Sequence, residues 1–267
     1  MVSPCFYKYS VAGNDFFVCD NRLGIWNDKG KDFWAVLCAR RTGVGADGVL
    51  LLESDPSADF RMRYLNSDGG EVEMCGNGAR AISHFASLLE IAPKNAPYYT
   101  FTTTRSTYRS MVEGLIVQVE MTELLDIGAI DVSDWVEENL FLDGWYLNTG
   151  VPHVVFIVED VKDVEIAEIA PAMRYDSRFI AGANINFAQV TGDKILLRTY
   201  ERGVEGETLA CGTGATAAAV MVSRLLDLEG EFEVVMPGGS LWITVKNNER
   251  WLKGIVQIIY RGELCLK

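Results

Sequence analysis

The feature that most constrains this chain is an internal repeat. RYLNSDGGEVEMCGNGARA (63–81) aligns without gaps with TYERGVEGETLACGTGATA (199–217), at an offset of 136 residues. Identical residues pair Tyr64 with Tyr200, Gly70 with Gly206, Glu71 with Glu207, Cys75 with Cys211, Gly76 with Gly212, Gly78 with Gly214, Ala79 with Ala215, and Ala81 with Ala217. Such self-similarity predicts two similar halves. The two Cys-Gly-x-Gly motifs would then lie in equivalent positions about a pseudo-twofold axis.

Each copy of the repeat joins a strand to a helix. FRMRYLN (60–66) and ILLRTYE (195–201) precede the cysteines and alternate like strands. AISHFASLLEI (81–91) follows the first motif with apolar residues spaced by three and four, which predicts a helix. GATAAAVMVSRLL (214–226) is apolar nearly all round, which predicts a helix enclosed by sheet. Both cysteines are therefore expected at helix amino termini.

Strand patterns dominate the rest of the chain. They are DGVLLLE (47–53), YYTFTTT (98–104), GLIVQVEM (114–121), HVVFIVED (153–160), INFAQV (185–190), EFEVVM (231–236), LWITV (241–245) and IVQIIY (255–260). TGDK (191–194) and PGGS (237–240) are typical of hairpin connections. Few helices interrupt these strands, so we expect an α+β fold of two similar domains related by pseudo-twofold symmetry.

Charge and composition exclude several classes of function. The formal net charge of −13 over 267 residues, with no basic run, disfavours nucleic acid and anionic membrane surfaces as partners. No 18 apolar residues run together, and the first residues, MVSPCFYKYS, lack the pattern of a signal peptide. We therefore expect a cytoplasmic protein.

The cysteines and histidines argue against structural disulfides and metal sites. The six cysteines, at positions 5, 19, 38, 75, 211 and 265, form no CxxC and no framework spacing. Only His84 and His153 are present, too few for a histidine-based metal site. We expect reduced thiols, no bound metal, and a structural role for His84 within the first helix.

Two thiols at equivalent helix starts suggest one kind of chemistry. The helix dipole and unpaired backbone N–H groups lower a thiol pKa and favour thiolate, which can act as a general base. The same N–H groups bind a carboxylate and stabilise the charge that builds on it when an α-proton leaves. If Cys75 and Cys211 served opposite faces of one α-carbon, the chain would racemise or epimerise an amino acid without a cofactor. No persuasive lysine and phosphate site for pyridoxal phosphate is evident.

Other interpretations of the cysteines remain open. Cys5, Cys19, Cys38 and Cys265 are expected to be small apolar residues with no chemical role. The chain could instead be a non-catalytic amino-acid-binding protein, although such a protein has no need for two thiols in matched settings. It could also be a redox sensor that forms a disulfide between Cys75 and Cys211 reversibly.

The sequence resembles the diaminopimelate epimerase family. The two cysteine motifs carry this resemblance together with GNDF (13–16), GVGADG (43–48), VPH (151–153), NINF (184–187) and YERG (200–203), in order along the whole chain. The resemblance implies two α+β domains, 1–122 and 123–254, each a curved, mostly antiparallel sheet around a central helix, with strand 255–267 returning to the first domain. It also implies a site in the cleft between the domains, a homodimer, and interconversion of LL- and meso-diaminopimelate for lysine and peptidoglycan synthesis.

The resemblance also implies roles for particular residues. Cys75 and Cys211 match the catalytic pair. Donors to the reacting carboxylate would be Gly76, Asn77, Gly212 and Thr213, and the substrate's other polar groups would be held by Asn14, Asn66, Asn184, Glu201 and Arg202. His153 matches a position from which it could tune a thiol. A guanidinium can grip a distal carboxylate bidentately and a carboxylate can take a distal ammonium, which suits Arg202 and Glu201.

Two departures bear on substrate choice. Many family members have an asparagine before Pro-His and a glutamine after GxGxD, where this chain has Val151 and Gly48. Each loss removes an amide from the expected site, so glutamate or aspartate could also be accepted. Proline racemases also use two cysteines, but typically carry a histidine where this chain has Asn77, and the phenazine-type isomerases lack the cysteine pair.

Overall fold

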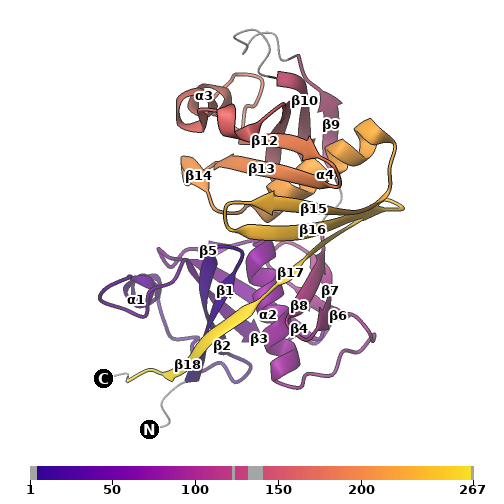
Figure 1. Ribbon diagram of the computed structural model, residues 1–267. Helices are drawn as coiled ribbons and strands as arrows, with labels where there is room; N and C mark the ends of the chain where they lie inside the picture. Colours follow the sequence, from indigo (N-terminus) through magenta and orange to yellow (C-terminus); the bar gives the residue numbers. More distant parts are fainter. Residues whose placement is uncertain (1–4, 122–123, 132–140, 266–267) are drawn as a thin grey trace. The chain divides into compact units, whose positions relative to one another are not determined.

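The computed structural model describes residues 5–121, 124–131 and 141–265. The chain divides into two compact units, one of Met1–Glu120 with Gly254–Lys267 and one of Met121–Lys253 (Figure 1). The domain boundary expected between residues 122 and 123 lies outside the described residues. Within the part of the chain that is described, no helix is long and apolar enough to cross a membrane.

The first unit is a mixed sheet around one helix. Its strands lie in the order β18 (Gln257–Glu263), β1 (Cys5–Val11), β2 (Asn14–Asp20), β3 (Gly48–Glu53), β4 (Phe60–Asn66), β6 (Tyr99–Thr102), β7 (Thr107–Glu113) and β8 (Ile116–Glu120), and the short β5 (Glu71–Val72) also pairs with β4. Neighbours are antiparallel except β2 with β3 and β4 with β6. Helix α2 (Gly76–Leu88) lies against β1, β2, β3, β4, β7 and β8.

The second unit repeats this arrangement. Its strands lie in the order β9 (Leu125–Ala129), β10 (Phe141–Asn148), β11 (Pro152–Val158), β12 (Asn184–Thr191), β13 (Lys194–Glu201), β15 (Gly230–Met236), β16 (Gly239–Lys246) and β17 (Glu249–Ile255), and β14 (Gly206–Thr208) also pairs with β13. The parallel pairs again fall at the third and fifth steps, β11 with β12 and β13 with β15. Helix α4 (Gly212–Leu226) lies against β10, β11, β12, β13, β15 and β16. The predicted α+β fold of two similar halves is confirmed.

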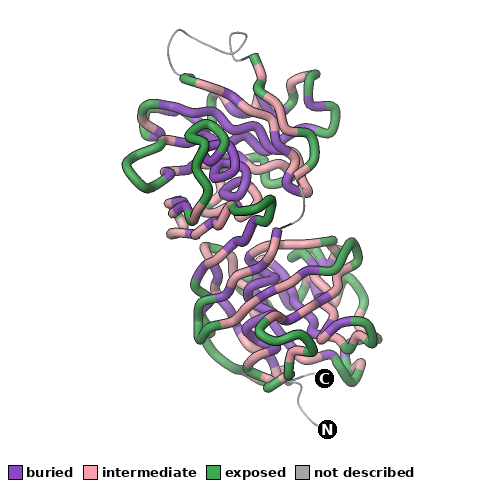
Figure 2. The backbone as a smooth tube through the Cα atoms, turned by 90° about the vertical axis from the view of Figure 1, so that its right-hand side faces the viewer, coloured by how far each residue is buried: buried purple, intermediate pink, exposed green. Residues whose placement is uncertain are grey.

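Both central helices are enclosed by their sheets. Every residue from 77 to 86 of α2 and from 214 to 223 of α4 is buried. Figure 2 shows buried backbone in the interior of each unit. An enclosed helix needs small or apolar side chains on all sides, and the alanines of GATAAAVMVSRLL supply them. Helix α2 also buries larger side chains, among them Arg80 and Phe85, and the Phe85 ring lies 5.2 Å from that of Tyr7.

A second apolar cluster covers the other face of β2 and β3. Helix α1 (Lys31–Cys38) and the loop before it bury Trp26 and Trp34 against Phe17. The sequence reasoning did not predict α1, nor the helix α3 (Ile166–Arg174) and the short 3-10 turn Val161–Asp163 of the second unit. Packing of α1 positions the loop that carries Arg40 and Asp47.

The hairpins and most strands follow the predictions. Strands β12 and β13 join through TGDK, and β15 and β16 join through PGGS. IVQIIY, expected as one strand, is divided between β17 and β18 at Val256. This residue is fully buried in the first unit's core, and its N–H donates to the carbonyl of Leu115.

Candidate active site

Each repeat cysteine caps the start of a central helix. Cys75 is the N-cap of α2, and its sulfur accepts from the N–H of Gly78 at 3.4 Å. Cys211 is the N-cap of α4, and its sulfur accepts from the N–H of Gly214 at the same distance. Both caps have extended backbone dihedrals, as N-cap residues do. The predicted placement of both thiols at helix starts is confirmed.

The first turn of each helix presents backbone donors beside its thiol. Gly76 and Asn77 begin α2, and Gly212 and Thr213 begin α4. N–H groups in a first turn have no carbonyl partner within the helix, and the dipole makes this end positive. Sulfur is a weak acceptor, so the caps leave the remaining donors able to bind an anion.

The position three residues after each cysteine is tightly packed. A Cβ added at Gly214 would lie 2.5 Å from Oδ1 of Asn186 and 3.3 Å from Sγ of Cys211. A Cβ at Gly78 would lie 3.1 Å from Leu50 and 3.3 Å from Met62. These glycines therefore allow close packing of the helix start against its sheet.

A chain of side-chain amides crosses the start of α2. Nη2 of Arg80 donates to Oδ1 of Asn77 at 2.5 Å, Nδ2 of Asn77 donates to Oδ1 of Asn14 at 2.8 Å, and Nδ2 of Asn14 donates to Oδ2 of Asp47 at 3.1 Å. Each side-chain amide has two N–H groups and donates one of them to the next member of this row. Asn77 and Asn14 therefore each keep one N–H for another acceptor. Two predicted site residues, Asn14 and Asn77, are thus brought together with fixed amide orientation.

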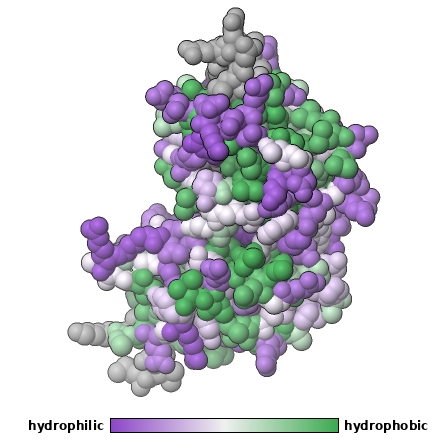
Figure 3. Space-filling view, viewed as in Figure 1, coloured by the Kyte–Doolittle hydropathy of each residue, from purple (hydrophilic) through white to green (hydrophobic). Residues whose placement is uncertain are grey.

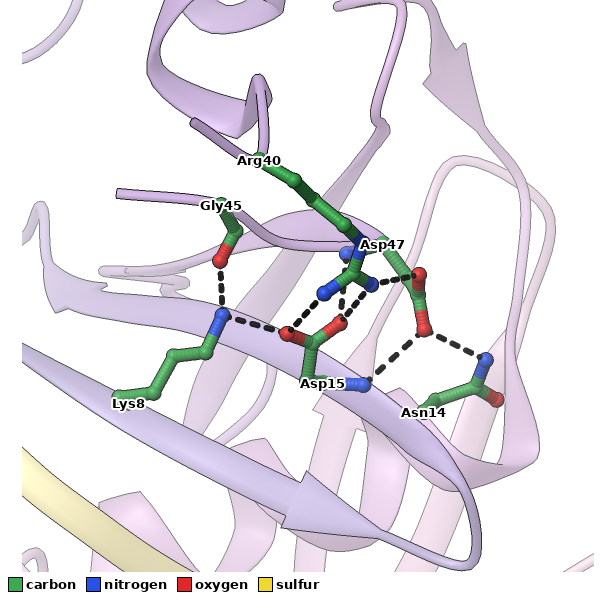
Figure 4. Close-up of polar contacts among 6 residues, drawn as sticks. All are labelled: Lys8, Asn14, Asp15, Arg40, Gly45 and Asp47. Carbon is green, nitrogen blue, oxygen red and sulfur yellow. Dashed lines mark hydrogen bonds and ion pairs between the residues drawn. The ribbon is translucent and has the colours of Figure 1, made fainter. Parts of the chain in front are cut away.

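At its Asn14 end, this row of hydrogen-bonded amides joins a network of charged side chains (Figure 4). Arg40 bridges the carboxylates of Asp15 and Asp47 with contacts of 2.6 Å to each, and the buried Lys8 lies 2.7 Å from Asp15 and also donates to Gly45. Burial by itself would raise the pKa of Asp15, but the hydrogen bonds from Arg40 and Lys8 outweigh it and lower that pKa to about 2.

The second unit carries an uncharged polar cluster. Nδ2 of Asn186 lies 3.1 Å from Nδ1 of the fully buried His153, and Nδ2 of Asn184 lies 3.4 Å from Nε2. Oδ1 of Asn184 accepts from the N–H of Arg202 at 2.7 Å, and Oδ1 of Asn186 accepts from Thr199 at 2.9 Å. Each imidazole nitrogen therefore lies beside a side-chain amide, and burial lowers the pKa of His153 to about 3. This histidine is neutral at physiological pH.

The predicted residues of the YERG motif lie at the end of β13. Burial raises the pKa of Glu201. Arg202 is half-buried, and its Nη1 donates to the carbonyl of Ala181 at 2.9 Å. Thr213 lies in the first turn of α4, with its hydroxyl 3.4 Å from Sγ of Cys211.

Three other positions that the sequence analysis named are Asn66, Val151 and Gly48, and their surroundings differ from one another. Asn66 is exposed at the end of β4, where its backbone forms a turn with Gly69 and Gly70. Val151 is half-buried, and its carbonyl accepts from the N–H of Thr149. A Cβ at Gly48 would lie 2.5 Å from the ring of Tyr64, so Tyr64 fills the space that a longer side chain would need.

Cys19, Cys38 and His84 have surroundings that suit structural roles, whereas Cys5 is partly buried beside Arg261 and Cys265 is exposed. Burial raises the pKa of the Cys38 thiol to about 11 and that of the Cys19 thiol well above its usual value. Nδ1 of His84 lies 2.9 Å from the Tyr9 hydroxyl within the core of the first unit. No group of three His, Cys, Asp or Glu side chains able to hold a metal occurs among the described residues.

Sequence reasoning missed several residues of these clusters, above all Arg80, Asp47 and Asn186. The repeat itself contained a signal for Arg80, because the equivalent position in the second copy is Thr216. A difference between two otherwise matched helix starts marks a place where the two halves diverge.

The fold has counterparts among solved structures. A phenazine biosynthesis protein of the PhzF family from Bacillus anthracis superposes with a TM-score of 0.75 over 100% of both chains at 15% identity. A probable proline racemase from Agrobacterium radiobacter gives a TM-score of 0.65 over 99% of this chain and 94% of that chain, also at 15% identity. The chain is thus a duplicated α+β protein of the fold class that these structures share.

Comparison of sequences narrows this class to one family. The family model for diaminopimelate epimerase matches residues 6–102 and 145–263. Diaminopimelate epimerase of Chlorobaculum tepidum is 38% identical over 266 residues, covering 96% of this chain and 100% of that protein, and the Aquifex aeolicus enzyme is 40% identical over 282 residues, covering 97% of each. The chain therefore belongs to the diaminopimelate epimerase family, and it is an epimerase of the isomerase class.

The network around Asp15 predicts a pH-dependent loss of stability in Asp15→Asn. The low pKa means that this carboxylate stabilises the fold above its usual pKa near 4, and that this contribution disappears as the pH falls towards 2. Asp15→Asn should cost about 2 to 3 kcal/mol of unfolding free energy at pH 7, measured with urea, and the difference from wild type should shrink as the pH is lowered.

Asp20→Asn is the matched control. Asp20 pairs with Arg22 at 2.6 Å, but the two side chains are 35% and 38% exposed, so its loss should cost less than about 1 kcal/mol. Equal costs for the two variants, or a cost for Asp15→Asn that is the same at pH 3 and pH 7, would contradict the assignment.

Proposed function

We propose that this protein interconverts LL- and meso-2,6-diaminopimelate by a two-base mechanism with Cys75 and Cys211. The observation that carries the proposal is that both thiols cap equivalent helix starts in a duplicated unit. The thiolate of one cysteine removes the α-proton, and the thiol of the other gives its proton to the opposite face of the resulting carbanion. The configuration at the α-carbon inverts. One proton is removed and one is delivered, so the reaction balances without a cofactor.

Backbone donors supply the stabilisation that this reaction needs. Loss of an α-proton places negative charge on the adjacent carboxylate, and preorganised N–H groups at a helix start oppose that charge without rearrangement. Gly76 and Asn77 at α2, with Gly212 and Thr213 at α4, are the residues that we assign to this carboxylate. The N–H that the Asn77 amide keeps for another acceptor suits the same role.

The remaining polar residues would bind the distal ammonium and carboxylate. We assign Arg202 and Glu201 to these two charges, because a guanidinium pairs with a carboxylate and a carboxylate with an ammonium. Asn14, Asn66 and Asn184 would supply amide contacts. The pKa of Glu201 is raised by burial, and an ammonium beside it would favour its ionised form.

His153 would influence the Cys211 thiol as an uncharged polar group. Its imidazole is neutral and contacts Asn186, whose Oδ1 packs against the start of α4 at Gly214. We propose that this cluster fixes the surroundings of Cys211 without adding a charge.

Lysine and peptidoglycan synthesis, a cytoplasmic location and a homodimer complete the proposal. For the dimer, the support within the chain is an apolar surface on β18, where Ile258, Ile259 and Tyr260 are 36%, 55% and 44% exposed. Figure 3 shows apolar atoms on the face of the first unit over which β18 passes.

Proton exchange tests the reaction directly. The reduced protein in D2O should exchange the α-proton of LL-diaminopimelate, followed by NMR, and Cys75→Ala and Cys211→Ala should each abolish net epimerisation. The matched control is Cys38→Ala, which removes a buried thiol outside the proposed pair. No exchange in the reduced wild type would favour a binding protein, and turnover that survives both substitutions would overturn the two-thiol mechanism.

Substrate selectivity tests the consequence of Val151 and Gly48. We expect measurable exchange with L-glutamate and L-aspartate, at lower kcat/KM than with diaminopimelate, because two amides are missing. Val151→Asn should raise the preference for diaminopimelate about tenfold, the value of one added hydrogen bond to a charged group. Strict exclusion of the shorter acids by the wild type would defeat this expectation, and L-proline tests the racemase alternative.

The dimer is tested by sedimentation at micromolar concentration. Wild type should have twice the chain mass of 29.6 kDa, and Ile259→Lys should reduce it to the chain mass. Leu23→Lys, at a side chain that is 91% exposed elsewhere on the first unit, should leave the dimer intact. A wild type that sediments as a single chain would remove the dimer from the proposal.

A further inference from the structure

Arg80 is a buried cation without a carboxylate partner among the described residues. It lies in the second turn of α2 with an exposed fraction of 0%. Its Nη2 donates to Asn77, whereas Nε and Nη1 have no hydrogen-bond partner in the described part of the chain. Burying a guanidinium in this way is costly unless a negative charge lies nearby.

The charged groups on the surrounding strands are engaged elsewhere. Lys8 of β1 pairs with Asp15 of β2, Arg61 and Arg63 of β4 pair with Glu53 of β3 and Glu71 of β5, Arg109 of β7 pairs with Glu120 of β8, and Glu73 pairs with Arg105. The titratable groups of the core are neutral near pH 7, because burial raises the pKa of Tyr9 and Tyr108 and lowers that of His84.

The Cys75 sulfur is a nearby group whose negative charge can stabilise the Arg80 guanidinium. Burial lowers the pKa of Arg80 to about 10, and the negative charge of a Cys75 thiolate opposes that fall. Such an interaction is reciprocal, so the guanidinium stabilises the thiolate as much as the thiolate stabilises the guanidinium. Geometry places the two groups near one another, since Arg80 binds Asn77 in the same first turn that Cys75 caps.

The position equivalent to Arg80 in the second half carries no charge. The repeat places Thr216 where the first half has Arg80, and its hydroxyl donates to the carbonyl of Gly212 at 2.9 Å. Around Cys211 lie the hydroxyl of Thr213 and the neutral cluster of Asn186 and His153. The two thiols therefore share backbone geometry, but the residue five positions after each is a cation in the first half and a hydroxyl in the second.

We infer that Arg80 is a positioning residue that keeps Cys75 as the thiolate in the resting protein, while Cys211 rests as the thiol. The inference rests on the proposed two-thiol function and deepens it, because it assigns the base and the acid at the start of the cycle. Arg80 touches no substrate in this assignment, and it acts through Cys75 and Asn77.

Alkylation of the two thiols measures this asymmetry without any turnover. The reduced full chain is treated with iodoacetamide across a pH series, and alkylation of the Cys75 and Cys211 peptides is followed by mass spectrometry. The pH midpoint of each rate is compared, because the midpoint reports thiolate formation whereas the absolute rate also reports access. In the wild type, the Cys75 midpoint should lie below that of Cys211 by about one pH unit or more.

Variants at the repeat position separate charge from structure. Arg80→Met should raise the Cys75 midpoint by about one pH unit or more and leave the Cys211 midpoint unchanged, and Arg80→Lys should restore most of the difference. Thr216→Val is the matched control and should leave the Cys75 midpoint unchanged. Thermal unfolding of each variant shows that the helix is intact.

Equal midpoints for the two cysteines in the wild type would overturn the inference, even if Arg80→Met fails to fold. An unchanged Cys75 midpoint in a folded Arg80→Met would overturn it as well. Neither result depends on epimerisation, so failure of the proposed function, seen as absent proton exchange, is distinguished from failure of this inference.

Discussion

The structure depends on the enclosure of each central helix by its own sheet. The ten buried residues of each helix follow a half-buried start, Gly76 in α2 and Gly212 and Thr213 in α4, whose N–H groups have no carbonyl partner within the helix. Cysteine is a weak cap for such a helix, since sulfur accepts at 3.4 Å and satisfies only one donor. Each half therefore has a helix start that is incompletely capped. The backbone N–H groups left without a partner within the helix can bind a carboxylate beside the thiol.

Much of this arrangement could be predicted from the sequence. The repeat fixed the equivalence of the two halves, and the strand before each cysteine and the apolar helix after it placed both thiols at helix starts. These inferences succeed because they depend on local periodicity and on a motif that occurs twice. The α+β class followed from the same periodicities.

Other features depend on contacts between residues far apart in the chain and could not be predicted in this way. The amide chain links positions 14, 47, 77 and 80, and no local pattern indicates that their side chains meet. Helix α1 was missed because its eight residues are too short for a clear period, and its tryptophan, Trp34, is explained only by packing against Phe17. The space at Gly48 depends on Tyr64, a neighbour in the sheet rather than in sequence.

The pairing of β18 with β1 has a consequence for how the protein is made. Cys5 pairs with Glu263, so the first and last described strands of the chain form one ladder of the first unit. A ribosome releases β18 only after all of the second unit has emerged. The sheet around the Cys75 helix therefore stays open at one edge while the second unit is made, and it is completed only when β18 becomes available to pair with β1.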